Sequence, residues 1–557
     1  MSTPVQPLPA QLNAIVHQGL QLMKSGQLQQ AEACFKTVLT HDENHREALL
    51  RLSIVSFHMK KVSEAESALK RLLKLEPNHV VAQISLGNIY TQSQRLEEAI
   101  KCHEAFLERN GPHPAIYYYL AVNYVYVEQT HDAIAALRQA IALNPKEEAP
   151  HLLLGNQLFL AREYGEAQAV YETAHHLGFK SFELIENLAK THTTLGDIEK
   201  AQAIYREGCE LYPNQFVLPY QLSRMDDSIL SDALEQRISA FLSANSSHDK
   251  NTMYAHYLRA RRAKQQQRFE DEMSHLAAAH HIYREIGEFS NTRAFYLEEL
   301  PQAYASRRTQ ALKPLDETSI LGSMTPVFLV GLPRSGSTLA ESMLCAGQQI
   351  VHKSEESGVM LHTVAPEQFE DTSAFWQSFA SDIEQAYSGF DVLERDGYFT
   401  DKSLDNVFML DVILKLLPKA KIIWCRRTPL ASLISIWQNN LFATPWAHQL
   451  DEIIQYFETS TGLMEKVQAQ HPDRIYSLHY EKLVKDSLTE SKKLFEFCDL
   501  PWSPDCLDFY KKKGLVSRTA SNIQVRQAVS QKPAEAYVRY IPFLQKYVDQ
   551  YSWLLKA

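Results

Sequence analysis

The sequence predicts a multidomain protein in which an all-α helical solenoid is followed by an α/β domain with a parallel sheet. Three observations lead to this prediction: a 34-residue repeat in the first 215 residues, a later alternation of apolar strands with helical patterns, and a glycine-rich turn between a strand and a helix. A chain of 557 residues is too long for one compact core. We expect a solenoid of six repeats over 1–215, degenerate helical repeats and a linker over 216–321, and the α/β domain over 322–557.

The repeat is marked by alanines that stand 34 residues apart, at Ala31, Ala65, Ala99, Ala133, Ala167 and Ala201. Twelve residues before each alanine stands another small residue: Gly19, Ser53, Gly87, Ala121, Gly155 and Ala189. Small side chains allow two paired helices to approach closely where they cross. Two amphipathic helices per 34 residues with this spacing resemble the tetratricopeptide repeat. The resemblance implies a groove for a peptide or protein partner, or alternatively a scaffold for a homodimer.

Beyond the repeats, the helical pattern continues without the 34-residue phase. The stretch YLRARRAKQQQRFEDEMSHLAAAHHIYRE, residues 257–285, has the pattern of one more degenerate repeat or of a cap. It carries a basic cluster of Arg259, Arg261, Arg262 and Lys264, which we interpret as a solvated helix face.

Composition argues against several classes of protein. The net charge of −10 disfavours general nucleic-acid binding. The seven cysteines are scattered without CxxC spacing, which is typical of reduced thiols and not of a metal site. The N-terminus has no basic region followed by an apolar run, and no apolar stretch reaches the roughly 18 residues of a membrane helix. We therefore expect a cytoplasmic protein without a metal, and with no nucleic acid or membrane among its partners.

The last part of the chain alternates short apolar runs with helical patterns. The runs are PVFLV, GYFTDK, KIIWCR and RIYSLHY, and each is followed by a segment with helical spacing of its apolar residues. Such alternation indicates parallel strands with helices on both faces of the sheet. Ligands of these sheets lie beyond the carboxyl ends of the strands, so we expect the functional site there.

The stretch GLPRSGST, from Gly331 to Thr338, has the form of a phosphate-binding loop between a strand and a helix. Its glycines permit a tight turn, and the hydroxyls of Ser335, Ser337 and Thr338 add donors near the start of the helix. A nucleotide kinase places a lysine after the second glycine, where this chain has Ser337. The loop therefore favours a single 5′-phosphate or phosphosulfate over a triphosphate, and a nucleotide kinase is the alternative.

The segment RSGSTL resembles the 5′-phosphosulfate loop of sulfotransferases that use 3′-phosphoadenosine 5′-phosphosulfate (PAPS). Bacterial tetratricopeptide-linked sulfotransferases and tyrosylprotein sulfotransferases carry the most similar variants. In KIIWCRRTPLASLIS, a strand ends in Arg427 and Ser435 follows eight residues later, like the pair that holds the donor's 3′-phosphate in this family. The resemblance implies a PAPS-binding, P-loop-like motif. It assigns donor binding to Arg334, Ser335, Gly336, Ser337, Thr338, Arg427, Ser435, Tyr480 and Arg526.

The same resemblance implies a set of catalytic residues. Glu355, in VHKSEESGVM, matches the base that takes the acceptor's proton, while Glu356 and His352 stay open as alternatives. Lys402, in GYFTDK, would stabilise charge on the leaving phosphate. Ser521, in SRTASNIQVRQ, would contact the reacting group.

These assignments predict a PAPS-dependent sulfotransferase that moves a sulfuryl group to a hydroxyl acceptor. A tyrosine in a peptide or protein is the favoured acceptor, and a carbohydrate, a lipid or a small phenol is an alternative. A protein of a different class is also open, namely a peptide-binding tetratricopeptide protein whose nucleotide-binding domain is catalytically silent.

Overall fold

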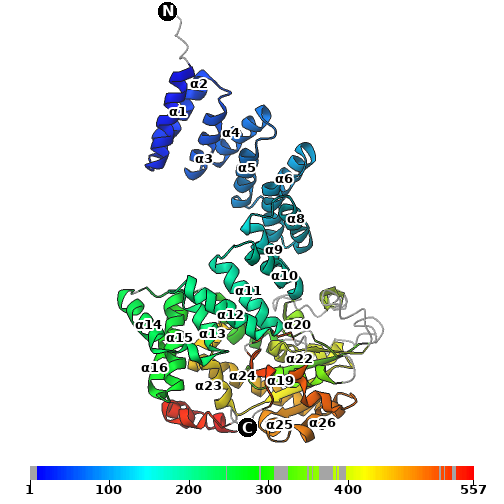
Figure 1. Cartoon of the computed structure of the whole chain (residues 1–557). Coiled ribbons are helices and arrows are strands. Elements are labelled where there is room, and N and C mark those ends of the chain that lie inside the picture. The colour runs from blue at the N-terminus through cyan, green and yellow to red at the C-terminus, as the bar shows by residue number, and fades with distance from the viewer. Residues whose placement is uncertain are drawn as a thin grey trace, which may run out of the picture. The chain divides into compact units, whose positions relative to one another are not determined.

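A computed structural model gives the fold of the protein (Figure 1). It describes residues 9–245, 247–287, 290–306, 324–347, 351–353, 355–362, 381–383, 385–387, 397–512, 516–517, 519, 521–529 and 535–556. The chain divides into two compact units, Met1–Thr191 and His192–Ala557. The domain boundaries predicted from the sequence stay a proposal. Within the described ranges, no helix is both long enough and apolar enough to span a membrane.

The repeats fold into a succession of α-helices, two for each 34-residue period. They are α1 (Pro9–Lys24), α2 (Leu28–His41), α3 (Arg46–His58), α4 (Val62–Leu75), α5 (Val80–Gln92), α6 (Leu96–Asn110), α7 (Pro114–Tyr126), α8 (Thr130–Leu143), α9 (Glu148–Leu160), α10 (Tyr164–His176), α11 (Phe182–Leu195) and α12 (Ile198–Leu211). The end of α11 and all of α12 belong to the second unit.

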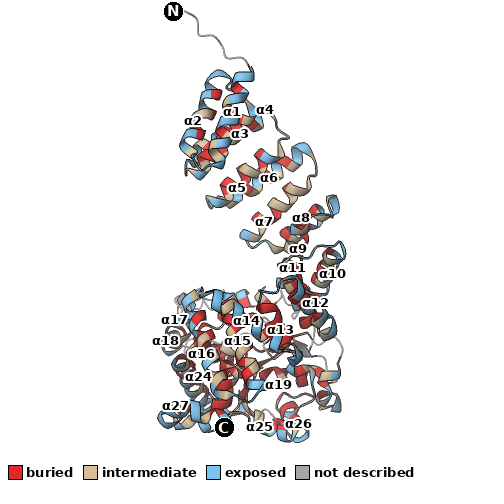
Figure 2. Ribbon diagram, turned by 60° about the vertical axis from the view of Figure 1, so that its left-hand side comes forward, coloured by how far each residue is buried: buried red, intermediate tan, exposed pale blue. Residues whose placement is uncertain are grey.

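Small residues stand where the helices of a pair meet. The alanines of the repeat have no exposed surface: Ala31, Ala65, Ala99, Ala133, Ala167 and Ala201. A Cβ atom at Gly87 would lie 2.2 Å from the ring of His103, and one at Gly155 would lie 2.3 Å from the ring of Tyr171. Since atoms cannot approach this closely, glycine is what allows these helices to pack. The predicted tetratricopeptide-type solenoid is confirmed, and buried residues recur along its helices in Figure 2.

A further set of helices, all in the second unit, precedes the sheet. They are α13 (Val217–Ser223), the 3-10 helix η1 (Asp227–Ile229), α14 (Asp232–Ala244), α15 (Lys250–Gln265), α16 (Phe269–Ile286), α17 (Ser290–Ala294), the π-helix η2 (Phe295–Glu299) and α18 (Leu300–Ser306). Helix α15 begins after Asp249, whose carboxylate accepts a hydrogen bond from the backbone N–H of Thr252 at 2.8 Å. Helices α15 and α16 pack against each other as a pair.

The second unit contains a five-stranded parallel sheet with the order β2-β3-β1-β4-β5. The strands are β1 (Thr325–Gly331), β2 (Val351–Lys353), β3 (Tyr398–Asp401), β4 (Lys421–Arg426) and β5 (Ile475–His479). Strands β1, β3, β4 and β5 confirm the four predicted strands. The sequence pattern does not predict β2, because a strand of 3 residues is too short to show a period.

Helices follow the strands and lead away from the sheet. The α-helices are α19 (Ser337–Ala346), α20 (Val359–His362), α22 (Leu410–Leu416), α23 (Pro429–Trp437), α24 (Leu450–Gln470), α25 (Tyr480–Lys485), α26 (Ser487–Phe497) and α27 (Gln545–Gln550). The 3-10 helices are η5 (Leu404–Met409), η6 (Pro445–His448), η7 (Pro472–Arg474), η8 (Pro504–Leu507), η9 (Phe509–Lys511), η10 (Gln524–Arg526), η11 (Val538–Leu544) and η12 (Ser552–Leu555).

Alternate side chains of the central strand enter two different hydrophobic cores. Phe328 and Val330 belong to a core that also contains residues of α15 and α16. Val327 and Leu329 belong to another core, which contains residues of α19 and α26. One face of the sheet and the helices that precede it in the chain therefore share a core, so α15 and α16 are fixed parts of the second unit.

Candidate active site

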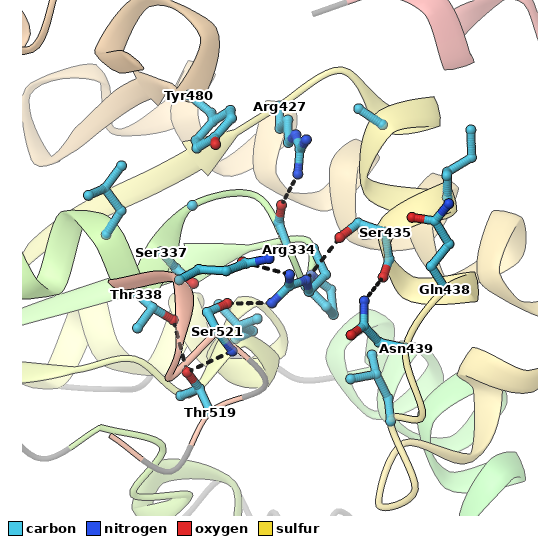
Figure 3. Close-up of a pocket in the computed structure, with 18 of the residues that line it drawn as sticks. Arg334, Ser337, Thr338, Arg427, Ser435, Gln438, Asn439, Tyr480, Thr519 and Ser521 are labelled. Carbon is cyan, nitrogen blue, oxygen red and sulfur yellow. Dashed lines mark hydrogen bonds between the residues drawn. The ribbon is translucent and has the colours of Figure 1, made fainter. Parts of the chain in front are cut away.

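A cavity of about 760 Å³ lies in the second unit, at the carboxyl ends of the strands (Figure 3). All five strands contribute to its wall through the residues that follow them: Arg334 after β1, Glu356 after β2, Asp405 after β3, Arg427 after β4 and Tyr480 after β5. Helices α15 and α16 and described residues between 519 and 540 complete the wall. This is the position expected for the ligand site of a parallel sheet.

Two glycines shape the turn between β1 and α19. Gly331 has a φ of 139°, and a Cβ atom there would lie 2.3 Å from the carbonyl oxygen of Cys425 on β4. Gly336 precedes α19 with a φ of 94°, and its Cβ would lie 2.5 Å from the ring of Tyr480. The first N–H groups of a helix have no partner inside the helix, so the start of α19 is suited to an anion. Ser337, the first residue of α19, lines the cavity.

We expect Gly336→Ala to lower the free energy of unfolding by about 1–3 kcal/mol, because alanine is strained at positive φ and its methyl group would displace the Tyr480 ring. The matched control is Gly462→Ala in α24, where a Cβ atom would meet nothing within 4 Å. In a helix interior that change should stabilise the protein slightly. Urea denaturation of both variants measures the difference. Equal stability of the two variants would contradict the strained geometry of the turn.

The hydroxyls of the loop are buried around this turn. Ser335 is 2% exposed, and its Oγ has no hydrogen-bond partner in the described part of the chain. Ser337 and Thr338 are also buried and line the cavity. Thr338 Oγ1 lies 3.4 Å from Thr519 Oγ1. A buried hydroxyl without a partner costs free energy, so an oxygen of a bound ligand would satisfy Ser335.

The Arg334 side chain lies between Ser435 and Ser521 (Figure 3). Its Nε donates to Ser435 Oγ at 3.0 Å, its Nη1 donates to Ser521 Oγ, and its Nη2 donates to Gln524 Oε1 at 2.8 Å. These three acceptors are uncharged. Burial, together with the nearby charge of Arg427, lowers the pKa of Arg334 to about 10. The guanidinium is therefore a partly buried cation whose hydrogen bonds all go to neutral groups.

Arg427 lies on the same wall of the cavity. Its Nη1 donates to the backbone oxygen of Arg334 at 2.9 Å, and its guanidinium carbon lies 4.7 Å from the centre of the Tyr480 ring. Burial lowers the pKa of Arg427. Ser435, on α23, reaches the same side through its bond with Arg334. The structure thus brings together Arg334, Arg427, Ser435 and Tyr480, as the sequence predicts, while their role as donor contacts stays a prediction.

Two adjacent glutamates take different positions. Glu356 lines the cavity, its side chain is 57% exposed, and its Oε1 lies 2.8 Å from Nζ of the buried Lys402. Glu355 is 6% exposed and is not among the described lining residues. Lys353 Nζ donates to its Oε1 at 2.9 Å. Glu355 also has a φ of 51°, and a strained backbone of this kind is common at functional sites.

Behind these glutamates lies a third carboxylate, which the sequence analysis missed. Glu341, on α19, is fully buried and accepts a hydrogen bond from Thr400 Oγ1 at 3.0 Å. Burial raises the pKa of Glu341. Burial alone would lower the pKa of Lys402, but the carboxylates of Glu356, Glu341 and Glu355 raise it above its ordinary value. Lys402 therefore stays protonated; it is not itself among the described lining residues, but it pairs with Glu356, which is.

Three other predicted residues take separate positions. Ser521 lines the cavity and is held by Arg334. Arg526 is not among the described lining residues, and its Nη2 donates to the backbone oxygen of Thr194 at 3.0 Å. This contact anchors the segment after Ser521 to the end of α11. His352 lies on β2, and its side chain falls outside what the structure describes.

Asp405 is a cavity residue that the sequence analysis missed. It follows β3 by a few residues, and Tyr456 Oη donates to its Oδ1 at 2.6 Å. Burial raises the pKa of Asp405 to about 6. The signal that could have found Asp405 is its position just beyond a predicted strand.

The basic cluster of the helical segment does not form a simple solvated face. Arg259 pairs with Glu235 at 2.9 Å, and Arg262 pairs with Asp232, both on α14. Arg261 and Lys264 line the cavity instead. Lys264 is exposed, so the solvated-face interpretation holds for it, but this face of α15 also borders the cavity, because residues three apart lie on the same side of a helix.

The fold and the site define the class of the second unit: an α/β domain whose turn between β1 and α19 has Ser337 where a kinase loop has lysine. Residues 326–504 match the profile of the sulfotransferase family. Residues 9–108 match the middle TPR-like domain of cilia and flagella-associated protein 70, and residues 182–215 match the tetratricopeptide repeat. The chain therefore combines a tetratricopeptide-repeat region with a domain of the sulfotransferase family.

A curated relative is an uncharacterized protein of Aquifex aeolicus (strain VF5), which is 24% identical over 431 residues. The match covers 72% of this chain and 55% of the relative, so the chain spans about half the length of the curated relative. Among solved structures, PilF of Pseudomonas aeruginosa is 18% identical with a TM-score of 0.31. The match covers 36% of this chain and 92% of the PilF chain. MamA is 22% identical with a TM-score of 0.26, and the match covers 29% of this chain and 94% of the MamA chain. TM-scores this low say nothing about function.

Proposed function

We propose that the protein transfers a sulfuryl group from PAPS to a hydroxyl acceptor. The observation that carries this proposal is the positive charge of the Arg334 guanidinium beside the turn between β1 and α19, where its hydrogen-bond partners are neutral. Arg334 donates only to neutral groups, and Arg427 lies next to it at the end of β4. Guanidinium groups bind phosphate in a bidentate manner, so both residues are suited to an anionic donor.

The loop offers further support for a phosphosulfate and not a nucleoside triphosphate. It has Ser337 where a kinase has lysine, and the Ser335 hydroxyl is left for a ligand oxygen. In the described part of the chain, no group of three or more His, Cys, Asp or Glu side chains could hold a metal ion. We propose that the start of α19 receives the 5′-phosphosulfate and that Arg427 with Ser435 receives the 3′-phosphate.

In the proposed reaction, the acceptor oxygen forms a bond to sulfur while the bond from sulfur to the 5′-phosphate oxygen breaks, and that oxygen keeps the electron pair. Lys402 stabilises the charge that develops on this oxygen. A carboxylate of the Glu355–Glu356 pair takes the proton of the acceptor hydroxyl. Ser521 donates a hydrogen bond at the donor's phosphate once Arg334 releases it.

The geometry favours Glu356 as the base. Its carboxylate lines the cavity, whereas Glu355 lies behind the wall against Lys353. The ion pair with Lys402 holds Glu356 at the place where leaving oxygen and acceptor meet. When Lys402 turns to the donor, Glu356 loses that partner and becomes a stronger base.

We propose a tyrosine in a peptide or protein as the acceptor, because a tetratricopeptide array provides a groove for an extended chain. Incubation with sulfur-labelled PAPS and a lysate tests this choice. Label in protein supports it, and label only in small molecules contradicts it. No transfer at all, with donor binding intact, would favour a silent nucleotide-binding domain on an interaction protein.

A thermal-shift comparison tests the donor. Adenosine 3′,5′-bisphosphate should raise the melting temperature, and ATP with magnesium should not, because the loop lacks the lysine of a kinase. A shift with ATP and magnesium alone would contradict the proposal in favour of a nucleotide kinase.

Arg427→Ala should weaken the binding of adenosine 3′,5′-bisphosphate by about 2–4 kcal/mol, because a charge-assisted pair with phosphate is lost. The matched control is Arg426→Ala. The guanidinium carbon of Arg426 lies 4.4 Å from the centre of the Trp424 ring, and Arg426 is not among the described lining residues of the cavity. Calorimetric titration compares the two variants. Equal losses would show that the effect is one of net charge and not of a specific phosphate contact.

A further inference from the structure

The helices that precede the sheet contribute positive charge to the donor cavity. Arg261 and Lys264 from α15 and Arg539 from η11 line it, and we call these three residues the cationic wall. All three lie outside residues 326–504, which match the sulfotransferase family. The family match therefore gives no role to the cationic wall.

Lys264 is held at the cavity by a neutral partner. Its Nζ donates to Gln438 Oε1 at 2.7 Å, and it makes no ion pair with any residue in the described ranges. Lys264 is exposed to solvent, so its ammonium group is accessible to a ligand in the cavity. Arg539 packs over the ring of Phe269, with 5.3 Å between its guanidinium carbon and the ring centre. Arg261, by contrast, is partly neutralised by Asp227 at 3.2 Å.

One carboxylate lies beside the wall but is engaged by neutral donors. Glu272, on α16, accepts hydrogen bonds from Tyr540 Oη and from Gln438 Nε2, each at 2.8 Å. Burial raises the pKa of Glu272, although the charges of Lys264 and Arg539 act in the opposite direction. Two cations face this single carboxylate, so the wall keeps a net positive charge.

Gln438 indicates where the cationic wall lies relative to the proposed donor site. Gln438 stands three residues after Ser435, one helical turn along, and both line the cavity. Figure 3 shows the two side chains on the same side of the cavity, while Ser337 and Thr338 lie on the other. Lys264, bound to Gln438, is thus next to the place proposed for the 3′-phosphate.

We propose that the cationic wall, mainly through Lys264, binds the 3′-phosphate of the donor together with Arg427 and Ser435. This inference rests on the proposed function. An anionic acceptor is the competing ligand, but an acceptor must reach Lys402, which follows β3, and Glu356, which follows β2. Residues that follow the strands and residues of the preceding helices therefore both select a nucleotide that carries a 3′-phosphate.

The test compares two nucleotides that differ only in the 3′-phosphate. Adenosine 3′,5′-bisphosphate and adenosine 5′-monophosphate are titrated calorimetrically into the full chain and into Lys264→Gln. The variant should bind the bisphosphate about tenfold more weakly, with less than about a twofold change for the monophosphate. Lys264→Arg should retain most of the affinity for the bisphosphate, because it keeps the charge. Lys466→Gln, an exposed position on α24 outside the cavity, should change neither affinity.

The outcomes separate this inference from the proposed function. A wild-type protein that binds neither nucleotide overturns the proposed function itself. A wild-type protein that prefers the bisphosphate, with the same preference in Lys264→Gln, overturns only the role of the wall. An equal loss for both nucleotides, or a Lys264→Arg variant as weak as Lys264→Gln, also overturns it. A higher KM for the acceptor with unchanged donor affinity would assign the wall to the acceptor instead.

Discussion

Replacement of Glu356 by glutamine is expected to lower the rate of sulfuryl transfer by about 10²–10⁴, which is the usual contribution of a general base. Glutamine keeps the length of the side chain and an oxygen that can accept from Lys402, but it cannot take a proton from the acceptor. Donor affinity should therefore stay near that of the wild type. Single-turnover assays with labelled PAPS measure the transfer step, and calorimetric titration of adenosine 3′,5′-bisphosphate measures donor binding.

The matched control is the same change one residue earlier. Glu355→Gln should transfer sulfate at nearly the wild-type rate, because Glu355 is buried against Lys353 behind the cavity wall. An inactive Glu355→Gln beside an active Glu356→Gln would show that the buried glutamate, which the family resemblance assigns, is the base. Activity in both variants would contradict a carboxylate base and would direct attention to His352.

The helical part of the fold could be predicted from the sequence because its structure is periodic. A fixed 34-residue spacing places Ala65, Ala99 and their equivalents at the same helix crossing, so local patterns determine the packing. Strand β2 could not be predicted, since its 3 residues show no alternation and it forms by pairing with β3, which is distant in sequence.

The sheet topology explains the predicted site residues that follow a strand. Arg334, Arg427 and Tyr480 stand at the ends of β1, β4 and β5, and the topology of a parallel sheet brings such positions together. Lys264 could not be found in this way. It comes from a helix more than a hundred residues from most of the site, and it reaches the cavity because one face of the sheet shares a core with α15.

The sequence also could not show which of two neighbouring glutamates faces the cavity. Adjacent glutamates in the segment SEES have the same chemistry, and only the backbone turn decides which faces the cavity. Glu355 has a φ of 51°, and the two carboxylates have different partners. The Glu355 carboxylate contacts Lys353, and the Glu356 carboxylate contacts Lys402. A turn of this kind leaves no compositional signal.

Replacement of Lys402 by methionine is expected to lower the transfer rate by about 10²–10³, the range seen when one preorganised donor to a developing charge is removed. Lys402 is 1% exposed, and the negative charges of Glu356, Glu341 and Glu355 hold it protonated. Its loss also leaves Glu356 without its ion-pair partner. A lower melting temperature is therefore expected as well, and the assays must be run where the variant stays folded, as checked by circular dichroism.

The control for this effect is Lys353→Met, which removes a cation from the same carboxylate cluster. Lys353 lies 2.9 Å from Glu355 and 3.8 Å from Glu341, whereas Lys402 pairs with Glu356, which lines the cavity. Lys353→Met should destabilise the fold in the same way and yet retain most of the transfer rate, because the charge of Lys353 is not beside the leaving oxygen. Lys402→Arg should recover part of the activity lost in Lys402→Met. If Lys353→Met loses as much transfer as Lys402→Met, the loss comes from the disturbed cluster, and Lys402 has no direct part in stabilising the leaving group.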